Sequence, residues 1–184
     1  MTLFDKPGKE NTKATLDICL AAARERSINQ IVIATSTGEV AKAFLPYVKE
    51  FHIVCVGQVY YFRADLENAM SEETRKEILD GGMTLYHGSH VLSGAERALS
   101  GTMQGVYPVE IIAHTLRLFG QGTKVAVECA VMALDAGLIK PGPTISVGGT
   151  GRGADTAIIL SPASASRILD TQIHEFLCKP SFYS

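Results

Sequence analysis

Short apolar runs rich in β-branched residues alternate with longer segments of helical periodicity along most of the chain. The runs at residues 31–34, 51–56 and 83–86 have the length and composition of buried strands. Helix-like segments lie between them, which is typical of parallel strands joined by crossover helices. The sequence therefore predicts an α/β fold whose mainly parallel sheet is covered by helices on both faces.

Several of the expected helices carry recognisable boundary signals. Asn11 or Thr12 is placed to cap the first helix, and Ser71 is placed to cap the third. Glu72 and Glu73 then complement the dipole of that third helix in its first turn. We expect helices at residues 12–26, 39–45, 72–80, 108–119 and 124–136.

The C-terminal part of the chain has a different pattern. Strand-like runs at residues 144–147 and 156–160 flank a glycine-rich loop, and a last strand is expected at residues 173–178. Two strands joined directly by a loop pair in antiparallel fashion. We therefore expect the sheet to be antiparallel at this end.

The charge balance excludes one class of partner. The 184 residues carry 17 Lys and Arg against 19 Asp and Glu, a formal net charge of −2. The pI is near 6.2, whereas nucleic-acid-binding domains commonly exceed about 9. A hydrophobic fraction of 46% with 20% charged residues is ordinary for a globular protein. We expect one domain over residues 1–184 and no nucleic-acid partner.

No run reaches the roughly 18 apolar residues of a membrane span. Residues 1–11 are polar and lack the apolar core of a secretory signal. The four cysteines lie far apart in apolar runs, without metal-ligand spacing, at Cys19, Cys55, Cys129 and Cys178. We expect reduced core thiols, no metal site, no membrane partner and a cytoplasmic protein.

The segment Thr35-Ser36-Thr37-Gly38 lies between a predicted strand and a predicted helix. A helix N-terminus offers unpaired N–H groups and partial positive charge, to which hydroxyl groups add further donors. Gly38 lets the backbone approach a ligand, so we expect a side chain there to obstruct a phosphate. No lysine follows, so this is not the phosphate loop of nucleoside triphosphatases. The pattern fits either a phosphate site or a Ser/Thr helix cap without a ligand.

A second candidate is the glycine-rich loop from Gly148 to Asp155. It superficially resembles a dinucleotide fingerprint, but that fingerprint requires a helix directly after the glycines, and here a strand-like run follows. A flexible loop can instead fold over an anionic or aromatic ligand, because the guanidinium of Arg152 offers both charge and a flat face. A solvated hairpin loop is the alternative.

The segment His87-Gly88-Ser89-His90 follows the predicted strand at residues 83–86. Ligands of open α/β sheets bind beyond the carboxyl ends of the strands, where this segment can meet the first two. Neither a GxSxG motif nor a serine–histidine–acid order stands out. We therefore assign no catalytic residue.

Glu128 lies among apolar residues in the predicted helix 124–136, seven residues before Asp135. A buried carboxylate needs a partner, which is either a ligand group or a structural hydrogen-bond donor. Tyr60, Tyr61 and Phe62 offer flat apolar surface either to a ligand or to the core or an oligomer contact. The sequence leaves both alternatives open in each case.

Together these segments resemble the C-terminal α/β domain of pyruvate kinase, and more closely the stand-alone proteins similar to it. In pyruvate kinase that domain holds a sugar-bisphosphate effector, through a Thr/Ser-rich turn like residues 35–38 and a Gly- and Arg-containing loop like residues 149–153. The resemblance extends from Asn11 to Pro180. The stand-alone proteins add signatures matched by Gly88-Ser89-His90-x-Leu92-Ser93-Gly94, Lys124-Val125-x-Val127-Glu128 and residues 148–156.

The resemblance implies a three-layer α/β/α fold, bound flavin mononucleotide (FMN) as in crystal structures of family members, and no known reaction. By analogy with pyruvate kinase it also implies a homo-oligomer. One departure lies at residues 57–62, where relatives tend to carry a His-containing run ending in Gly-Phe. The resemblance and the motifs together give these cofactor-site residues: Thr35, Ser36, Thr37, Gly38, Gly57, Gln58, His87, Ser89, His90, Glu128, Gly149, Thr150, Gly151, Arg152, Gly153, Asp155 and Thr156.

Three functions fit this sequence. Binding of a phosphorylated small molecule, with FMN as cofactor, ranks first, since neither a nicotinamide site nor a proton donor beyond His87, His90 and Tyr60 is evident. A flavin-dependent oxidoreductase is second, and a phosphosugar or nucleotide effector module is third. Pyruvate kinase activity is excluded, because its barrel alone needs about 250 residues.

Overall fold

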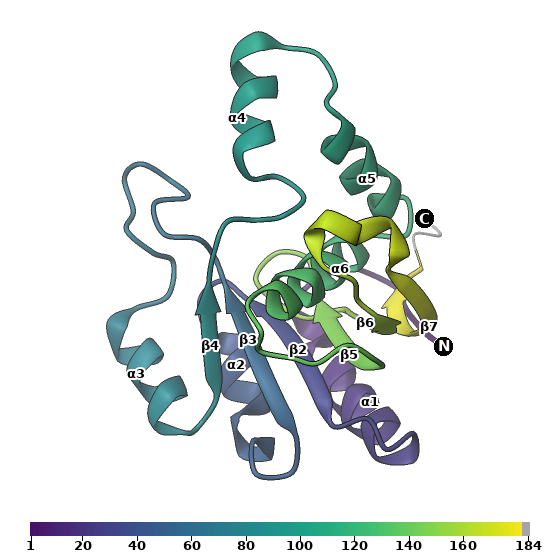
Figure 1. The fold of residues 1–184 in the computed structure, drawn as a ribbon. Coiled ribbons are helices and arrows are strands. Elements are labelled where there is room, and N and C mark those ends of the chain that lie inside the picture. Colours follow the sequence, from purple (N-terminus) through teal and green to yellow (C-terminus); the bar gives the residue numbers. More distant parts are fainter. Residues whose placement is uncertain (182–184) are drawn as a thin grey trace.

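The computed structural model describes residues 1–181, which form a seven-stranded sheet in the order β1-β7-β6-β5-β2-β3-β4 (Figure 1). The strands β2, β3, β4 and β5 are parallel to one another, and β1 is parallel to β7. β6 is antiparallel to both β5 and β7, which confirms the predicted antiparallel C-terminal part. The bounds are β1 Thr2–Phe4, β2 Gln30–Thr35, β3 His52–Gly57, β4 Thr84–His87, β5 Thr144–Gly148, β6 Thr156–Ser161 and β7 Gln172–Pro180.

Helices cover both faces of the sheet, so the expected three-layer α/β/α fold is confirmed (Figure 1). α1 (Thr12–Glu25), α2 (Glu39–Phe44) and α3 (Glu72–Asp80) pack on one face, and α6 (Gln121–Asp135) packs on the other. Successive residues of a strand point to opposite faces. Accordingly Ile31 and Ile33 of β2 lie in the core with α1 and α2, whereas Val32 between them packs against α6.

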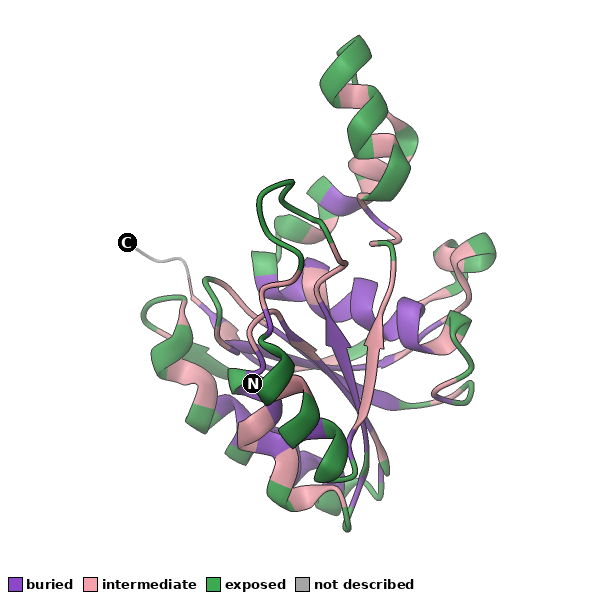
Figure 2. Cartoon of the chain, turned by 90° about the vertical axis from the view of Figure 1, so that its left-hand side faces the viewer, coloured by how far each residue is buried: buried purple, intermediate pink, exposed green. Residues whose placement is uncertain are grey.

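An arm of two helices, α4 (Gly94–Met103) and α5 (Pro108–Arg117), projects from this body (Figures 1 and 2). No residue of α4 is buried, and large apolar side chains of the arm such as Met103 and Val106 are exposed. The sequence analysis missed α4. Its ten residues include strong helix formers such as Ala95, Glu96 and Leu99, but Gly94 and Gly101 lower the helix propensity of the segment. It also missed β1, which is only three residues long.

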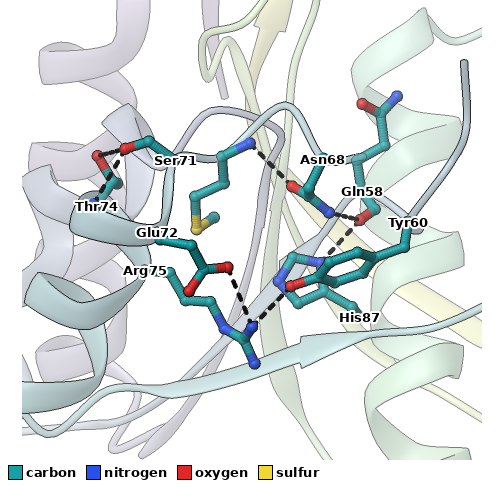
Figure 3. Close-up of polar contacts among 9 residues, drawn as sticks. Gln58, Tyr60, Asn68, Ser71, Glu72, Thr74, Arg75 and His87 are labelled. Atoms are coloured by element: carbon teal, nitrogen blue, oxygen red, sulfur yellow. Dashed lines mark hydrogen bonds and ion pairs between the residues drawn. The ribbon is translucent and has the colours of Figure 1, made fainter. Parts of the chain in front are cut away.

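Most predicted boundaries lie within a few residues of the observed ones. Ser71 caps α3 as predicted, since its Oγ accepts a hydrogen bond from the N–H of Thr74 at 3.2 Å (Figure 3). Asn11 is the N-cap residue of α1, as predicted, but no side chain makes a capping bond: the side chains of Asn11 and Thr12 donate to carbonyls on the N-terminal side of the helix. A short 3-10 helix, Lys9–Asn11, precedes α1, and two further 3-10 helices lie at Leu45–Tyr47 and Ala165–Asp170.

All four cysteines are buried and free, as predicted. Burial raises the pKa of the Cys178 thiol to about 11, and it raises the pKa values of the other three as well. Within residues 1–181, no helix combines the length and the apolar character needed to cross a membrane.

Candidate functional site

A cavity of about 190 Å³ lies where β2, β3 and β5 end at the carboxyl edge of the sheet. We call it the main cavity. The structure brings together in it residues from all four sequence segments that were expected to form a site. Its lining consists of the predicted residues Thr35, Ser36, Gly57, Gln58, His90, Glu128, Gly149, Arg152 and Gly153, with Ala34, Val40, Val56, Val125 and Cys129.

The first wall of the main cavity is the β2–α2 turn, residues 35–38, which is held in place by its own contacts. The Gly38 N–H donates to Thr35 Oγ1 at 3.1 Å within the turn, but the N-cap of α2 is Gly38 itself, so no Ser or Thr side chain caps this helix. The Ser36 side chain lines the cavity, and among residues 1–181 it has no hydrogen-bond partner. Ser36 is therefore the hydroxyl of this turn that remains available to a ligand.

Gly38 serves a different purpose from the one expected. Its φ of 95° lies in the region that favours glycine, and a Cβ there would overlap Thr74 Cγ2 on α3. The expectation that a side chain at this position would obstruct a phosphate was wrong, because the missing side chain faces α3. Gly38 and Thr37 are outside the lining of the main cavity.

The second wall is the loop from Gly149 to Asp155, and its base is tightly closed. A Cβ at Gly149 would overlap the carbonyl oxygen of Gly153, so the two ends of the loop touch. A Cβ at Gly148 would overlap the carbonyl oxygen of Gly122, so β5 and α6 are also in contact here. These close backbone approaches place the loop beside α6 and explain the density of glycine.

The tip of the loop is exposed, whereas Asp155 and Thr156 are buried at its base. The Asp155 carboxylate accepts hydrogen bonds from the Gly8 N–H at 3.0 Å and from the Thr156 hydroxyl at 2.8 Å. The predicted site residues Asp155 and Thr156 thus lie outside the cavity and fix the loop to the N-terminal segment. Arg152 lines the cavity with an exposed side chain that has no ion-pair partner in residues 1–181, while Thr150 and Gly151 complete the tip outside the lining.

Glu128 of α6 combines the two roles that the sequence left open. Its side chain lines the main cavity, yet it is only 5% exposed and forms an ion pair with Lys124, which is equally buried. Its Oε1 accepts a hydrogen bond from the N–H of Leu92 at 2.9 Å. Both carboxylate oxygens therefore have protein partners, as a buried charge requires. Sequence reasoning did not name Lys124 as a site residue, although its i,i+4 spacing to Glu128 was a signal.

His90 forms part of the wall opposite the β2–α2 turn, and its surroundings favour the neutral imidazole. Burial is the main cause that lowers the pKa of His90, and Lys124 and Arg97 act in the same direction, whereas Glu128 opposes them. The ring of Phe62 lies 5.7 Å from that of His90, and the guanidinium of Arg97 lies 5.5 Å from the Phe62 ring. An aromatic residue of the 57–68 segment therefore covers this histidine.

His87 is outside the lining of the main cavity, and Figure 3 shows it next to Gln58 and Tyr60. Its Nδ1 is 2.8 Å from the backbone oxygen of Gln58, and because a carbonyl only accepts, Nδ1 donates. Its Nε2 is buried without a hydrogen-bond partner, and Tyr60 packs edge-on against the ring at 5.1 Å. Arg75 donates to the Tyr60 hydroxyl at 2.7 Å. Gly57 is needed here, because a Cβ would strike the His87 ring.

A second cavity of about 260 Å³ adjoins the main cavity, and His90 lines both. It contains the remaining predicted residue, Ser89, together with Glu96 of the arm and Asp135 of α6. Sequence reasoning missed this cavity, because α4, which contributes Gly94, Ala95 and Glu96 to its lining, was not predicted. No three His, Cys, Asp or Glu side chains of residues 1–181 converge in an arrangement that would hold a metal ion.

The model of the family described as "Pyruvate kinase, alpha/beta domain" matches residues 13–160 of the chain. The match extends from α1 to β6, and it contains every residue that lines the two cavities.

Proposed function

The chain belongs to the family of the pyruvate kinase alpha/beta domain, and from this premise we propose that it binds a phosphorylated cofactor, FMN, in the main cavity. One observation carries the proposal. The β2–α2 turn and the loop 149–153, which correspond to the two phosphate-ligand segments of the resemblance, line the same cavity. FMN is the ligand that the resemblance to the stand-alone proteins implies.

Ser36 and Arg152 supply the donors for the phosphate end. Both side chains line the cavity, and neither has a partner within the described residues. The start of α2 adds partial positive charge and backbone N–H groups that the helix itself does not pair. A hydroxyl, a helix start and a guanidinium are a donor set that suits a phosphate dianion.

The remainder of the lining suits a flat, largely apolar ring with polar edges. Val56 and Val125 form apolar walls, and the Gln58 side chain and the His90 imidazole provide hydrogen-bonding groups at the margin. Both carboxylate oxygens of Glu128 already have protein partners. Glu128 therefore shapes the floor of the main cavity, and Lys124 compensates its negative charge.

The volume of the main cavity requires movement when FMN binds. At about 190 Å³ it is smaller than the roughly 300–1,000 Å³ of typical ligand pockets. The tip of the glycine-rich loop is exposed at Gly151 and Arg152, and Arg152 lines the cavity, so the tip is expected to open and then close over the ligand.

The proposal is tested by titrating the purified protein with FMN and with riboflavin, which lacks the phosphate. The fluorescence of FMN should be quenched on binding. FMN should also bind at least tenfold more tightly than riboflavin, because charge-assisted hydrogen bonds contribute about 1.5–3 kcal/mol each. Absence of FMN binding at millimolar concentration, or equal affinity for riboflavin, would contradict the proposal.

Family membership also supports a phosphosugar effector as the ligand. This second candidate is separated from the first by competition: a sugar bisphosphate that displaces FMN from the protein at lower concentration than inorganic phosphate does would favour it. The oxidoreductase alternative requires substrate space beside the cofactor, which the second cavity supplies. Bleaching of bound FMN by a reduced nicotinamide would favour that alternative.

A homo-oligomer is proposed on the exposed apolar residues of the arm, which include Leu99, Met103, Val106 and Ile111. Native mass spectrometry tests this directly, since it reports the number of chains and the mass of any bound ligand in one measurement. A single chain at micromolar concentration would contradict it.

A further inference from the structure

We propose that the second cavity binds a small organic cation, a primary amine with an apolar body, next to the FMN site. The inference rests on the proposed function only for the identity of the neighbouring ligand. It assigns the substrate class that the main cavity does not reveal.

The position of the second cavity is the first argument. Residues from the end of β4, both helices of the arm and α6 line a cavity of about 260 Å³ that is partly open to solvent, since its lining residue Asp135 is exposed. His90 lines this cavity on one side and the main cavity on the other. A ligand in the second cavity and a ligand in the main cavity would therefore share His90 as a neighbour.

The charge of the lining is the second argument. Glu96 and Asp135 both line the cavity, while no lysine or arginine does. The nearby cations are engaged elsewhere, since Arg97 lies over the Phe62 ring and Lys124 is paired with Glu128. Because burial lowers the pKa of His90, the imidazole adds no opposing positive charge at neutral pH. The field inside this cavity thus favours a cation.

One oxygen of the Glu96 carboxylate supports this argument from charge. Its Oε2 is buried, and within residues 1–181 it has no hydrogen-bond partner, so a ligand reaches this oxygen when the Glu96 side chain turns into the cavity. An acceptor that is withdrawn from water and left unpaired is unfavourable, and native structures contain few of them. An ammonium group, with three N–H donors and a full positive charge, supplies what this oxygen lacks.

The rest of the lining limits the body of the ligand. Val91, Val109, Met132 and Ala95 are apolar, and Tyr86 adds an aromatic surface. Asp135 accepts from the Ala165 N–H at 3.1 and 3.2 Å, which fixes its carboxylate in the wall. Apolar walls with carboxylates favour an amphipathic amine over a hydrated inorganic cation. The volume fits a single ring or a short alkyl chain, as in benzylamine.

The test uses three probes of one shape and different charge: benzylamine, benzyl alcohol and benzoate at pH 7. Calorimetric titration of the full chain should give benzylamine an affinity at least tenfold higher than benzyl alcohol, and no binding of benzoate. Equal binding of the amine and the alcohol, or stronger binding of benzoate, would overturn the proposal.

Glu96→Gln is the decisive variant, with Glu110→Gln as its matched control on the arm. Glu110 accepts from Ser100 and is outside the lining of the second cavity. Glu96→Gln should lower the benzylamine affinity at least tenfold and leave that for benzyl alcohol unchanged, whereas Glu110→Gln should change neither. Thermal unfolding establishes that both variants fold. If Asp135→Asn and Glu96→Gln both leave benzylamine affinity unchanged, the assignment is wrong.

Repeating the titration with saturating FMN separates this inference from the proposed function. Both ligands should bind together, since their cavities are distinct. Glu96-dependent benzylamine binding by a chain that fails to bind FMN would support this inference and contradict the proposed function. Mutual exclusion of FMN and benzylamine would instead place both ligands in one cavity and overturn the second site.

Discussion

The two walls of the main cavity are built in opposite ways. The β2–α2 turn is fixed by the hydrogen bond from Gly38 to Thr35 and by packing of Gly38 against Thr74 of α3. The loop 149–155 is fixed only at its base, where Asp155 accepts two hydrogen bonds and the glycines touch. Its tip, with Arg152, is exposed.

This difference divides the tasks of ligand binding. A turn that is already ordered presents its donors without further entropy loss, whereas ordering a loop costs about 1–2 kcal/mol per residue. The rigid wall is therefore suited to define where a phosphate lies, and the mobile tip is suited to close over it. Predictions on the floor, on the two walls and on their motions test this division.

The largest effect is expected at the floor that both walls share. Glu128→Gln removes the charge that compensates Lys124, and both side chains are only 5% exposed. Breaking a buried pair by removing one partner costs about 3–5 kcal/mol. Urea unfolding should show a loss of this size, while the FMN affinity of the folded variant should change less than tenfold.

A double variant controls this prediction. Lys124→Met combined with Glu128→Gln removes both charges and should recover most of the stability. An unchanged stability of Glu128→Gln together with a hundredfold loss of FMN affinity would show instead that the carboxylate acts mainly on the ligand.

The next largest effect is a difference in stability between alanine variants of one glycine from each wall. Gly38 has φ 95° and Gly151 has φ 63°, so alanine is strained at both positions. At Gly38 the added Cβ also overlaps Thr74 Cγ2, whereas at Gly151 it meets nothing within 4 Å. Gly38→Ala should lower the free energy of unfolding by about 3 kcal/mol and Gly151→Ala by about 1 kcal/mol.

Thr74→Ser removes the overlapping methyl group and keeps the hydroxyl that contacts Ser71. In the Gly38→Ala background it should restore part of the lost stability, measured by thermal unfolding as a double-mutant cycle. Equal destabilisation by Gly38→Ala and Gly151→Ala would mean that the two walls are equally constrained.

The third prediction concerns affinity rather than stability. Arg152→Ala and Ser36→Ala should each weaken FMN binding about tenfold or more, because each removes a phosphate donor. Neither should change the melting temperature, since neither side chain has a protein partner within residues 1–181. Riboflavin affinity should be unaffected by both, and a matching loss for riboflavin would place these residues at the ring instead.

The sequence predicted those parts of the fold and site that depend on local signals. The apolar runs located β2 to β6, and the Ser/Thr and glycine content of residues 35–38 and 149–153 located both walls. Gly38 and Asp155 were placed at the ligand because the sequence does not show what a residue touches. Contacts with Thr74 and Gly8, distant in the chain, decide their roles.

The second cavity was beyond the reach of such signals. It depends on α4, which the sequence analysis missed, and on Glu96 and Asp135, which line the same cavity although they lie far apart in the sequence. The unpaired Oε2 of Glu96 is a property of packing alone. Charge at a position is visible in a sequence, but the absence of a partner is not.

The smallest effect separates the two walls by their motion. The tip of the glycine-rich loop, which is exposed at Gly151 and Arg152, should exchange its amide hydrogens rapidly in the free protein, and FMN should slow that exchange about tenfold by ordering the loop. The Gly38 amide is already bonded to Thr35 Oγ1, so its exchange should change less. Hydrogen exchange with mass spectrometry measures both segments at once, and residues 139–142, at the opposite end of β5, provide the internal reference.

In the Arg152→Ala variant, FMN should no longer slow exchange at the tip, because the tip closes on the ligand through the Arg152 guanidinium. The turn at residues 35–38 should exchange as it does in the parent protein. Slowing confined to residues 35–38 would leave the phosphate site in place and remove the glycine-rich loop from it, since a wall that does not respond to the ligand does not cover it.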